Sequence, residues 1–271
     1  MKARLNQHDV TYHIEGAAAP ADDGRVLLHA AVDLTANTPW APAGYCVAPG
    51  LAPPLQAQLQ HGLATLLREA LREAGVPVAA NFDVSHYHHA IADDSARHLA
   101  VVNQTKEIRQ QYLPIPAAVL EARVSELIGR RVQALNPWDG ERFFHLRIIR
   151  PHRPDNNPLH RDIWLPDYDD CLNIYLPVAG STPDSAMPLV PGSHHWPENR
   201  TGRTAQGAVY NGIRFTVPAL TNADAPLEIV RPSPRPDELL LFSPYLLHGG
   251  AVNLTPDATR VSLEMRFWPA D

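Results

Sequence analysis

The stretch Asn157-Pro-Leu-His-Arg-Asp-Ile-Trp164 places a histidine and an aspartate two residues apart, at His160 and Asp162. In an extended strand, side chains at this spacing point to the same face, so one metal ion could bind both. A third ligand, His248, ends the apolar run at residues 242–248 and precedes two glycines. Two imidazoles and one carboxylate are the ligand set of non-heme Fe(II) oxygenases, so these three residues are predicted to be the metal ligands and the catalytic centre.

A second pattern follows in residues 259–267, which read Thr-Arg-Val-Ser-Leu-Glu-Met-Arg-Phe. Their alternation predicts a strand with Arg260, Ser262, Glu264 and Arg266 on one face and apolar side chains on the other. A guanidinium makes two parallel charge-assisted hydrogen bonds to a carboxylate, and a hydroxyl two residues along can add a third. Arg260 and Ser262 therefore suit the distal carboxylate of 2-oxoglutarate. Arg266 in place of Arg260, or a solvated sheet edge, is the alternative.

Four features occur together in the C-terminal half: His160-x-Asp162, the segments 188–194 and 239–250, and Arg260. In combination they resemble the phytanoyl-CoA dioxygenase-like branch of the Fe(II)/2-oxoglutarate-dependent oxygenases, over residues 140–268. The resemblance implies a mainly β fold with flanking helices and a double-stranded β-helix (jelly roll, cupin-like) core. It also implies that His160 and Asp162 end one core strand, that His248 lies on another, and that Arg260, supported by Ser262, binds the C5 carboxylate of 2-oxoglutarate.

The same resemblance implies a dioxygenase that uses Fe(II), O2 and 2-oxoglutarate as cosubstrate, and that forms succinate and CO2. Related halogenases have a small residue in place of the carboxylate ligand, so Asp162 favours hydroxylation, desaturation or ring formation. We expect hydroxylation of a small polar metabolite or natural-product intermediate. A cupin-like metal-dependent hydrolase or isomerase with the same ligands, and a non-catalytic ligand-binding jelly roll, remain alternatives.

Further polar side chains are candidates for the cofactor and substrate sites. Arg147, Asn173 and Tyr175 alternate on two predicted strands and are candidate cofactor contacts, with core packing or surface exposure as the alternative. The long connection at residues 193–226 predicts a lid over the iron, because connections of this length are usually functional, although a plain surface loop is the alternative. Its polar and basic character favours a polar, anionic or hydroxylated substrate. The candidate substrate contacts are Trp164, Tyr168, Tyr210, Asn211 and Arg214.

A second group of histidines lies in residues 86–89, which read His-Tyr-His-His. His86 and His88 would share a strand face, but no carboxylate with ligand spacing stands beside them except Asp83, Asp93 and Asp94. We therefore interpret this group as a polar loop or a wall of the substrate site, and not as a second metal site. His194 and His195 follow Pro-Gly-Ser, and we expect them to orient a turn.

The periodicities predict one oxygenase domain over residues 1–271. A helix-rich part, 1–138, would support a jelly-roll core, 139–271, that includes the lid at 193–226. Leucines at three- and four-residue steps predict a helix over 55–71 that ends near Gly75, and Pro116 would open a second helix that extends to Ile128. The predicted strands are residues 25–32, 143–150, 171–178, 227–231, 238–242 and 260–268.

The amino-acid composition argues against two kinds of binding partner for this protein, nucleic acid and membranes. The formal net charge of −6 argues against nucleic acid as the main partner, because phosphate binding requires a clustered basic excess. Two cysteines are too few for a disulfide framework, and the N-terminal residues have no apolar signal core. The uncharged residues 34–67 are broken by proline and polar residues well short of a membrane span. We therefore expect a cytoplasmic enzyme that acts on a small molecule, with neither nucleic acid nor a membrane as partner.

Overall fold

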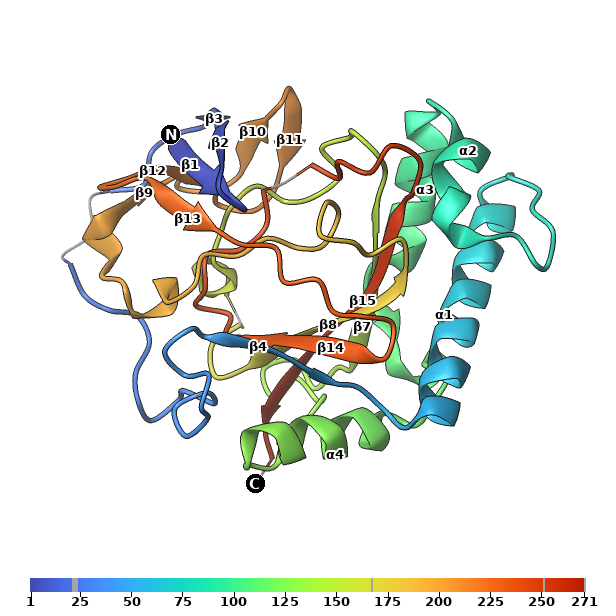
Figure 1. Cartoon of the computed structure of the whole chain (residues 1–271), viewed down its shortest axis with the longest axis horizontal. Coiled ribbons are helices and arrows are strands. Elements are labelled where there is room, and N and C mark those ends of the chain that lie inside the picture. The colour runs from blue at the N-terminus through green and yellow to red at the C-terminus, as the bar shows by residue number, and fades with distance from the viewer. Residues whose placement is uncertain (21–23, 167, 251, 271) are drawn as a thin grey trace.

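One large antiparallel sheet forms the centre of the fold (Figure 1). The structure is a computed structural model that describes residues 1–20, 24–166, 168–250 and 252–270. The strand order is β4-β14-β8-β15-β7-β5, and β6 pairs with the end of β15. The strands are β4 (Tyr45–Pro49), β5 (Ile108–Arg109), β6 (Val132–Gln133), β7 (Phe143–Ile149), β8 (Leu172–Ala179), β14 (Glu238–Phe242) and β15 (Arg260–Pro269).

Helices cover one face of this sheet. They are α1 (Pro53–Glu73), α2 (Tyr87–Ile91), α3 (Ser95–Thr105) and α4 (Ala117–Ile128). The leucine stripe of α1 packs with the apolar side chains of β7, β8, β14 and β15 in one core. Leu59, Leu63 and Leu67 are fully buried there, and burial of each such side chain contributes about 1.5–3 kcal/mol to stability. The opposite face of the sheet is left for the polar side chains of the same strands.

A second, irregular set of short strands faces the polar side of the sheet. Single β-bridges join residue 160 to residue 248, residue 248 to residue 189, and residue 189 to residue 230. These four segments come from distant parts of the chain, yet they lie side by side in that order. A regular sheet facing such a bridged set is a jelly roll. The expected mainly β fold with flanking helices is therefore confirmed.

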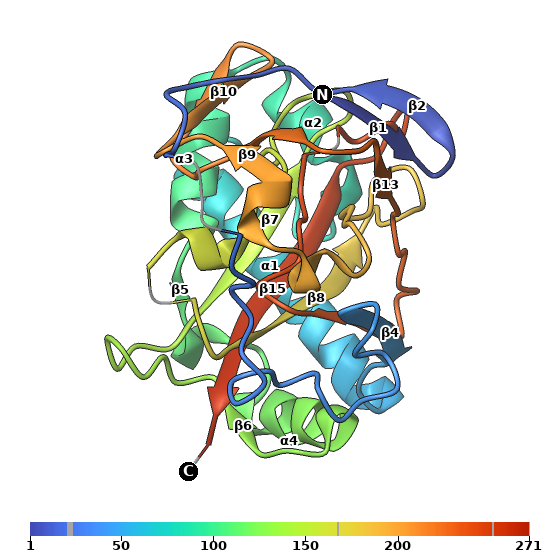
Figure 2. The ribbon, with the colours of Figure 1, turned by 90° about the vertical axis from the view of Figure 1, so that its left-hand side faces the viewer.

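Three small sheets gather at one end of the molecule, and α4 lies at the other (Figure 2). The first has the order β13-β1-β2, the second β11-β10-β3, and the third β12-β9. Their strands are β1 (Lys2–Leu5), β2 (His8–Thr11), β3 (Ile14–Glu15), β9 (Thr201–Arg203), β10 (Ala208–Tyr210), β11 (Ile213–Phe215), β12 (Leu220–Ala223) and β13 (Leu227–Ile229). The first residues of the chain thus pair with segments from the C-terminal half.

Five 3-10 turns complete the elements of the described residues. They are η1 (Val84–His86), η2 (Gln110–Tyr112), η3 (Asp162–Trp164), η4 (Ser193–His195) and η5 (Glu198–Arg200). The predicted helices at 55–71 and from Pro116, and the five predicted strands from residue 143 onward, are confirmed. The predicted strand at 25–32 is wrong, because the segment forms turns with one bridge, from Val26 to Pro197.

Candidate metal centre

The three predicted metal ligands come together in one pocket on the polar side of the sheet, and they are His160, Asp162 and His248. Asp162 Oδ1 lies 3.3 Å from His160 Nε2 and 3.5 Å from His248 Nε2. All three side chains are buried, and the two imidazole ring centroids are 4.3 Å apart. These separations are longer than a good hydrogen bond. They match the spacing of donor atoms that each lie about 2 Å from one shared metal ion.

The backbone explains how residues so far apart in sequence meet. His160 N–H donates to the carbonyl of His248 at 3.0 Å, and His248 N–H donates to the carbonyl of His160 at 3.0 Å. Asp162 is the first residue of η3, and its N–H donates to the Pro244 carbonyl. The expected regular strand is therefore absent, since His160 lies on a single bridge and Asp162 begins a 3-10 turn. Arg161 between them is extended, and the two side chains still converge.

Both imidazoles are held in the tautomer that a metal requires. His160 Nδ1 lies 2.7 Å from the Pro158 carbonyl, and His248 Nδ1 lies 2.9 Å from the Leu246 carbonyl. A carbonyl oxygen only accepts, so each Nδ1 must carry the proton. Each Nε2 then presents a lone pair to the shared centre.

Asp162 is kept ionised by its neighbours. Its second oxygen, Oδ2, accepts hydrogen bonds from Asn173 Nδ2 at 2.9 Å and Arg266 Nη2 at 3.2 Å. Burial opposes ionisation, but Arg266 and the two imidazoles outweigh it and hold the pKa of Asp162 well below its usual range. Oδ1 therefore remains a negatively charged donor for a cation.

Arg260 and Ser262 lie on the same inner face of β15 with unused hydrogen-bonding groups. Arg260 is 1 % exposed, and only its Nη1 has a recorded hydrogen bond, to the Ser185 carbonyl at 3.3 Å. Arg260 Nε, Arg260 Nη2 and Ser262 Oγ are buried and have no hydrogen-bond partner among the residues that the structure describes. Buried polar groups are nearly always paired, so three unpartnered donors on one strand face leave hydrogen bonds free for an anionic ligand. The residues present fit the carboxylate of 2-oxoglutarate.

The other candidate cofactor contacts share this face. The Arg260 guanidinium lies over the Tyr175 ring, 5.4 Å from its centroid. Asn173 Nδ2 donates to Asp162, while Asn173 Oδ1 is buried and has no partner within the described part of the chain. Arg147 donates to Glu264 at 2.9 Å. Arg147 and Asn173 line one pocket with the three candidate ligands, whereas Arg260, Ser262 and Tyr175 lie outside that lining.

Two of the five candidate substrate residues connect to the centre through other side chains. The Tyr168 ring lies under the Arg266 guanidinium at 4.1 Å, and Arg266 in turn bonds Asp162. Trp164 Nε1 donates to the Glu198 carboxylate at 2.9 Å. Neither aromatic ring is among the residues that line the pocket of the three ligands.

The remaining three candidates lie on the β10–β11 hairpin. Tyr210 is buried, its hydroxyl donates to the Gly250 carbonyl at 3.1 Å, and its ring stacks on Tyr12. Asn211 and Arg214 are exposed at and beyond the turn of the hairpin. The structure does not bring these three side chains to the metal ligands. Residues 193–226 are folded as short strands and turns, and their role as a lid stays a prediction.

Several residues around the centre were not predicted from the sequence. Arg161, in the middle of the His-x-Asp motif, is fully buried, and its Nη1 donates to Glu198 at 2.6 Å. Its Nη2 donates to the Ser193 carbonyl at 2.9 Å, and Ser193 Oγ accepts from Leu247 N–H at 2.8 Å, next to His248. A charged residue between two predicted ligands was the available signal, because burial of His160 and Asp162 forces Arg161 to find a buried anion.

The histidines after Pro-Gly-Ser lie apart from the three ligands. His194 is buried, and its Nε2 lies 2.9 Å from the Ala41 carbonyl. Burial lowers the pKa of His194 to about 4, so its imidazole is neutral near pH 7. Gly44 packs against this ring with φ +77°, and a Cβ there would lie 2.6 Å from the imidazole. His194 thus fills the space beneath the turn, as expected for a residue that orients it.

The family model described as phytanoyl-CoA dioxygenase (PhyH) matches residues 40–262. The chain belongs to this family, and it is therefore an Fe(II)/2-oxoglutarate-dependent oxygenase that acts on a small-molecule substrate. The sequence prediction of the family, the enzyme class and the cofactors Fe(II), 2-oxoglutarate and O2 is confirmed. The His-Asp-His cluster supplies the ligand set that this class of enzyme requires. The family assignment disfavours the hydrolase, isomerase and non-catalytic alternatives.

Several solved structures resemble the chain at low identity. EctD from S. alaskensis, crystallised with 2-oxoglutarate and 5-hydroxyectoine, is 17% identical with a TM-score of 0.48, over 94% of this chain and 83% of that one. AviO1 from Streptomyces viridochromogenes Tue57 is 16% identical with a TM-score of 0.46, over 84% and 90%. The epimerase SnoN from nogalamycin biosynthesis is 16% identical with a TM-score of 0.46, over 89% and 82%. No curated protein matches the chain.

Among the described residues, none of the helices combines the length and the apolar character needed to cross a bilayer.

Proposed function

We propose that the enzyme hydroxylates a small polar metabolite or natural-product intermediate while 2-oxoglutarate is converted to succinate and CO2. One observation carries the proposal. Three metal-binding atoms converge at one position of the barrel, and three unpartnered donors of Arg260 and Ser262 lie on the same inner face. A metal site and an anion site in one barrel suit a dicarboxylate cosubstrate that chelates the metal at one end.

We assign the metal to His160 Nε2, Asp162 Oδ1 and His248 Nε2, which are the catalytic ligands. Ferrous iron bound there would supply the redox chemistry that couples O2 reduction to oxidation of a C–H bond. The protein's own contribution is to fix the ligands. Asn173 and Arg266 hold the Asp162 carboxylate in one orientation, and the backbone carbonyls of residues 158 and 246 fix both imidazole tautomers.

We assign the C5 carboxylate of 2-oxoglutarate to Arg260, with Ser262 in support. A bidentate guanidinium contact orients a carboxylate as well as binding it. Tyr175 packs under the guanidinium and keeps water from one side of it. Arg147, which lines the ligand pocket and is one-third exposed, is available for the other carboxylate or for an acidic group of the substrate.

We propose that the substrate approaches past Trp164 and Tyr168, with residues 193–226 as the lid. Support comes from Glu198, a lid residue that binds both Trp164 and the buried Arg161 beside the metal ligands. Tyr210, Asn211 and Arg214 would contact substrate from the β10–β11 hairpin. A polar substrate that is anionic or hydroxylated would suit the arginines of this segment, Arg200, Arg203 and Arg214.

We also propose that the enzyme works in the cytoplasm without nucleic acid or membrane as partner. Its two cysteines, Cys46 and Cys171, are both free thiols, which suits a reducing compartment. Burial raises the pKa of Cys46 to about 12, so this thiol remains protonated and unreactive at neutral pH.

A metabolite panel tests the substrate class. The enzyme is incubated with Fe(II), ascorbate, 2-oxoglutarate and single candidates, and succinate release is measured alongside the product mass under 18O2. We expect one polar candidate to stimulate succinate release and to gain one oxygen atom from 18O2. Stimulation with a product two hydrogens lighter and without labelled oxygen would overturn hydroxylation in favour of desaturation or ring formation. Stimulation only by apolar candidates would overturn the proposed substrate class.

A further inference from the structure

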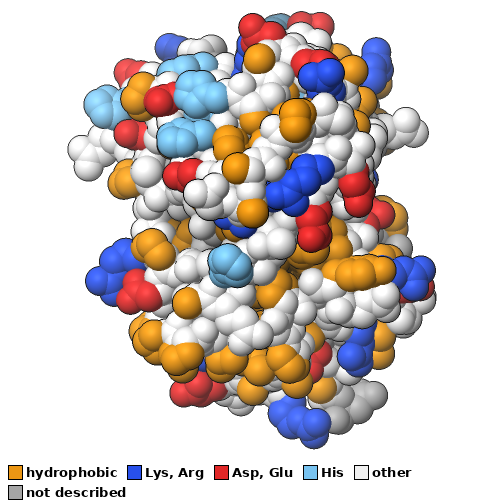
Figure 3. Space-filling model, turned by 90° about the vertical axis from the view of Figure 1, so that its right-hand side faces the viewer, with side chains coloured by type: hydrophobic (Ala, Val, Ile, Leu, Met, Phe, Trp, Pro, Cys, Tyr) orange, Lys and Arg blue, Asp and Glu red, His pale blue; other side chains and the backbone are white. Residues whose placement is uncertain are grey.

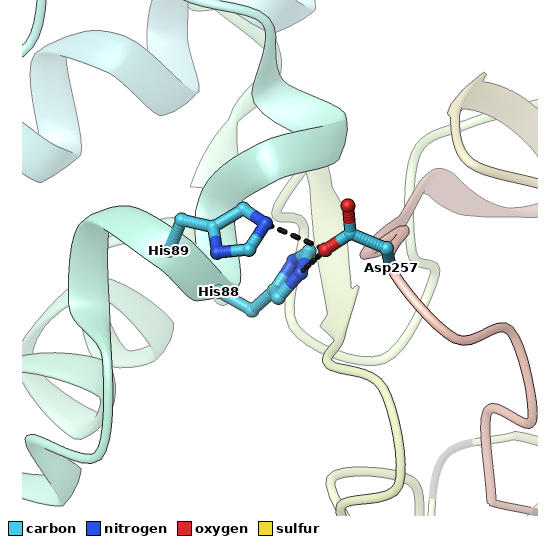
Figure 4. A group of neighbouring side chains, drawn as sticks. All are labelled: His88, His89 and Asp257. Atoms are coloured by element: carbon cyan, nitrogen blue, oxygen red, sulfur yellow. Dashed lines mark hydrogen bonds and ion pairs between the residues drawn. The ribbon is translucent and has the colours of Figure 1, made fainter.

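A second group of metal-binding side chains lies on the surface, remote in sequence from the iron ligands. His88 and His89 belong to the short helix α2, and Asp257 belongs to the loop that precedes β15. No sequence pattern joins them, because about 170 residues separate the histidines from the aspartate. The sequence predicts a polar loop or a wall of the substrate site for these histidines, whereas the structure places them on a helix that faces this carboxylate (Figure 4).

The three side chains converge on one point. Asp257 Oδ1 lies 2.9 Å from His88 Nε2 and 2.6 Å from His89 Nε2, and both rings point toward it (Figure 4). The two imidazole centroids are 4.1 Å apart. Two imidazole nitrogens thus face the same carboxylate oxygen, and the ion pairs recorded for Asp257 among the described residues are with these two histidines. A small increase in the distances between Asp257 Oδ1 and the two Nε2 atoms would make room for a metal ion among them.

His88 has the outer contact that metal-binding histidines usually have. Its second ring nitrogen, Nδ1, lies 2.9 Å from the Thr259 hydroxyl. Without an ion, Nε2–H donates to Asp257 Oδ1 at 2.9 Å; when an ion displaces this proton, Nδ1–H can donate to the Thr259 hydroxyl and Nε2 becomes a metal ligand. Metal ligands of proteins are commonly fixed in their tautomer by such a hydrogen bond on the far side of the ring. Thr259 is fully buried, so the contact is anchored in the core.

The cluster is accessible to an ion from solvent. The His88 side chain is 16% exposed, while His89 and Asp257 are 59% and 61% exposed. Histidine and acidic side chains gather on the face of the molecule that carries the helices α1 to α3 (Figure 3). One half-buried ligand held by a core hydroxyl and two exposed ligands make a site that is open on one side, with room for water molecules as further ligands.

We propose that His88, His89 and Asp257 bind a second transition-metal dication of the zinc class. Imidazole and carboxylate suit zinc, and three protein ligands with a water complete its tetrahedral shell. The bound ion would clamp α2 to the loop of residues 257–259, directly before Arg260. The site is separate from the iron centre, and its existence does not depend on the proposed function.

Zinc titration of the chelator-stripped protein by calorimetry tests the proposal, with zinc chloride as the probe. The wild type is expected to bind two equivalents, one at each histidine-carboxylate cluster. His89→Ala and Asp257→Asn are expected to bind one equivalent, with affinity at the outer site reduced at least tenfold. Asp162→Ala should lose the other equivalent and keep the outer one, which separates this proposal from the assignment of the iron ligands.

His13→Ala is the matched control, because His13 is an exposed histidine 3.5 Å from a single carboxylate, that of Glu15. It should leave two equivalents. The outer ligands are largely exposed, so their variants should unfold at the wild-type temperature in the absence of metal. Hydrogen exchange gives a second readout, since zinc should slow exchange of the Thr259 N–H, which donates to the Ser85 carbonyl. Zinc binding by His89→Ala and Asp257→Asn with the stoichiometry and affinity of the wild type would overturn the proposal.

Discussion

Arg260 is an arginine buried on the inner face of β15, and two of its nitrogens have no hydrogen-bond partner in the described ranges of the chain. Truncation of one partner in a buried charge-assisted contact costs about 2–5 kcal/mol. Arg260→Gln should therefore raise the KM for 2-oxoglutarate by about thirtyfold or more, since each 1.4 kcal/mol is a factor of ten. Steady-state kinetics with succinate detection measures it. Arg97→Gln, at an exposed ion pair, is the control and should leave this KM unchanged.

Arg266 is the alternative to Arg260 as the residue that binds the 2-oxoglutarate carboxylate. It occupies the same face of β15, but its guanidinium already bonds Asp162 and stacks on Tyr168. A normal KM for 2-oxoglutarate in Arg260→Gln, together with a large rise in Arg266→Gln, would move the carboxylate site to Arg266.

The buried carboxylate of Asp155 should make the free energy of unfolding depend on pH. Its carboxylate accepts two hydrogen bonds of 2.8 Å from the Arg150 guanidinium, and it lies 3.5 Å from His98 Nε2. Burial alone would raise the pKa of Asp155, but Arg150 and His98 hold it well below its usual range. A carboxyl with a depressed folded pKa contributes stability above its unfolded pKa, about 3.9. That contribution is lost as the pH falls through the folded pKa.

Asp155→Asn should therefore cost about 3 kcal/mol at pH 7, because it leaves a buried arginine without its anion. The difference from wild type should shrink below pH 4, because the carboxyl of the unfolded wild type becomes protonated there while that of the folded protein stays ionised. Urea unfolding at a series of pH values gives both quantities. The control is Asp93→Asn at an exposed pair with Arg153, which should change stability by less than about 0.5 kcal/mol. A deficit that stays constant down to pH 2 would refute the assignment.

The role of some single residues can be predicted from the sequence, whereas the role of others cannot. His160, Asp162 and His248 could be predicted because their types and spacing encode one ligand set, and the structure brings them together. Asp257 could not be predicted, since its partners on α2 are joined to it only by tertiary folding. The orphaned donors of Arg260 likewise need the burial of each atom, which alternation along a strand does not provide.

At the scale of elements, a buried ion pair joins the motif of the metal ligands to the long connection. Arg161 precedes η3, Glu198 begins η5, and their carboxylate–guanidinium contact of 2.6 Å is buried on both sides. Arg161 also reaches Ser193, whose hydroxyl accepts from the residue before His248. One side chain thus links the backbone on both sides of the candidate metal centre.

A double-mutant cycle measures this link. Arg161→Met alone should cost about 3–5 kcal/mol, because it removes the guanidinium that neutralises the buried Glu198 carboxylate and leaves the Trp164 Nε1–H as its close donor. Glu198→Met in the same chain should restore most of that loss, since an apolar pair removes both desolvation costs. Urea unfolding of the single and double variants gives the coupling free energy. Additive losses in the double variant would show that the two side chains do not act as a pair.

The elements themselves were predicted where periodicity is strong. The leucine stripe of α1 and the alternation of β15 each occupy long, unambiguous windows, and both are confirmed. The apolar run at residues 25–32 predicts a strand that does not form, because a short apolar segment carries no information about its partner. Helices α2 and α3 were missed, since the polar and histidine-rich residues 86–105 show a weak apolar face.

At the scale of the whole molecule, the chain was expected as a helix-rich part followed by a jelly-roll core. We propose that it acts as one domain, because the two parts are interleaved. β4 pairs with β14, and β1 pairs in parallel with β13, so the N-terminal part contributes strands to the C-terminal sheets. Such pairings between distant strands depend on which edges remain open after folding, and no local pattern of residues encodes them.

The central claim is that His160, Asp162 and His248 form the iron centre of a 2-oxoglutarate-dependent oxygenase. The direct test is succinate release from 2-oxoglutarate by purified wild type, Asp162→Ala and His248→Ala, with thermal unfolding to confirm that each variant is folded. We predict release by the wild type that requires Fe(II), is not supported by Zn(II), and falls at least a hundredfold in both folded variants. Equal release by the variants, or release without iron, would contradict the account.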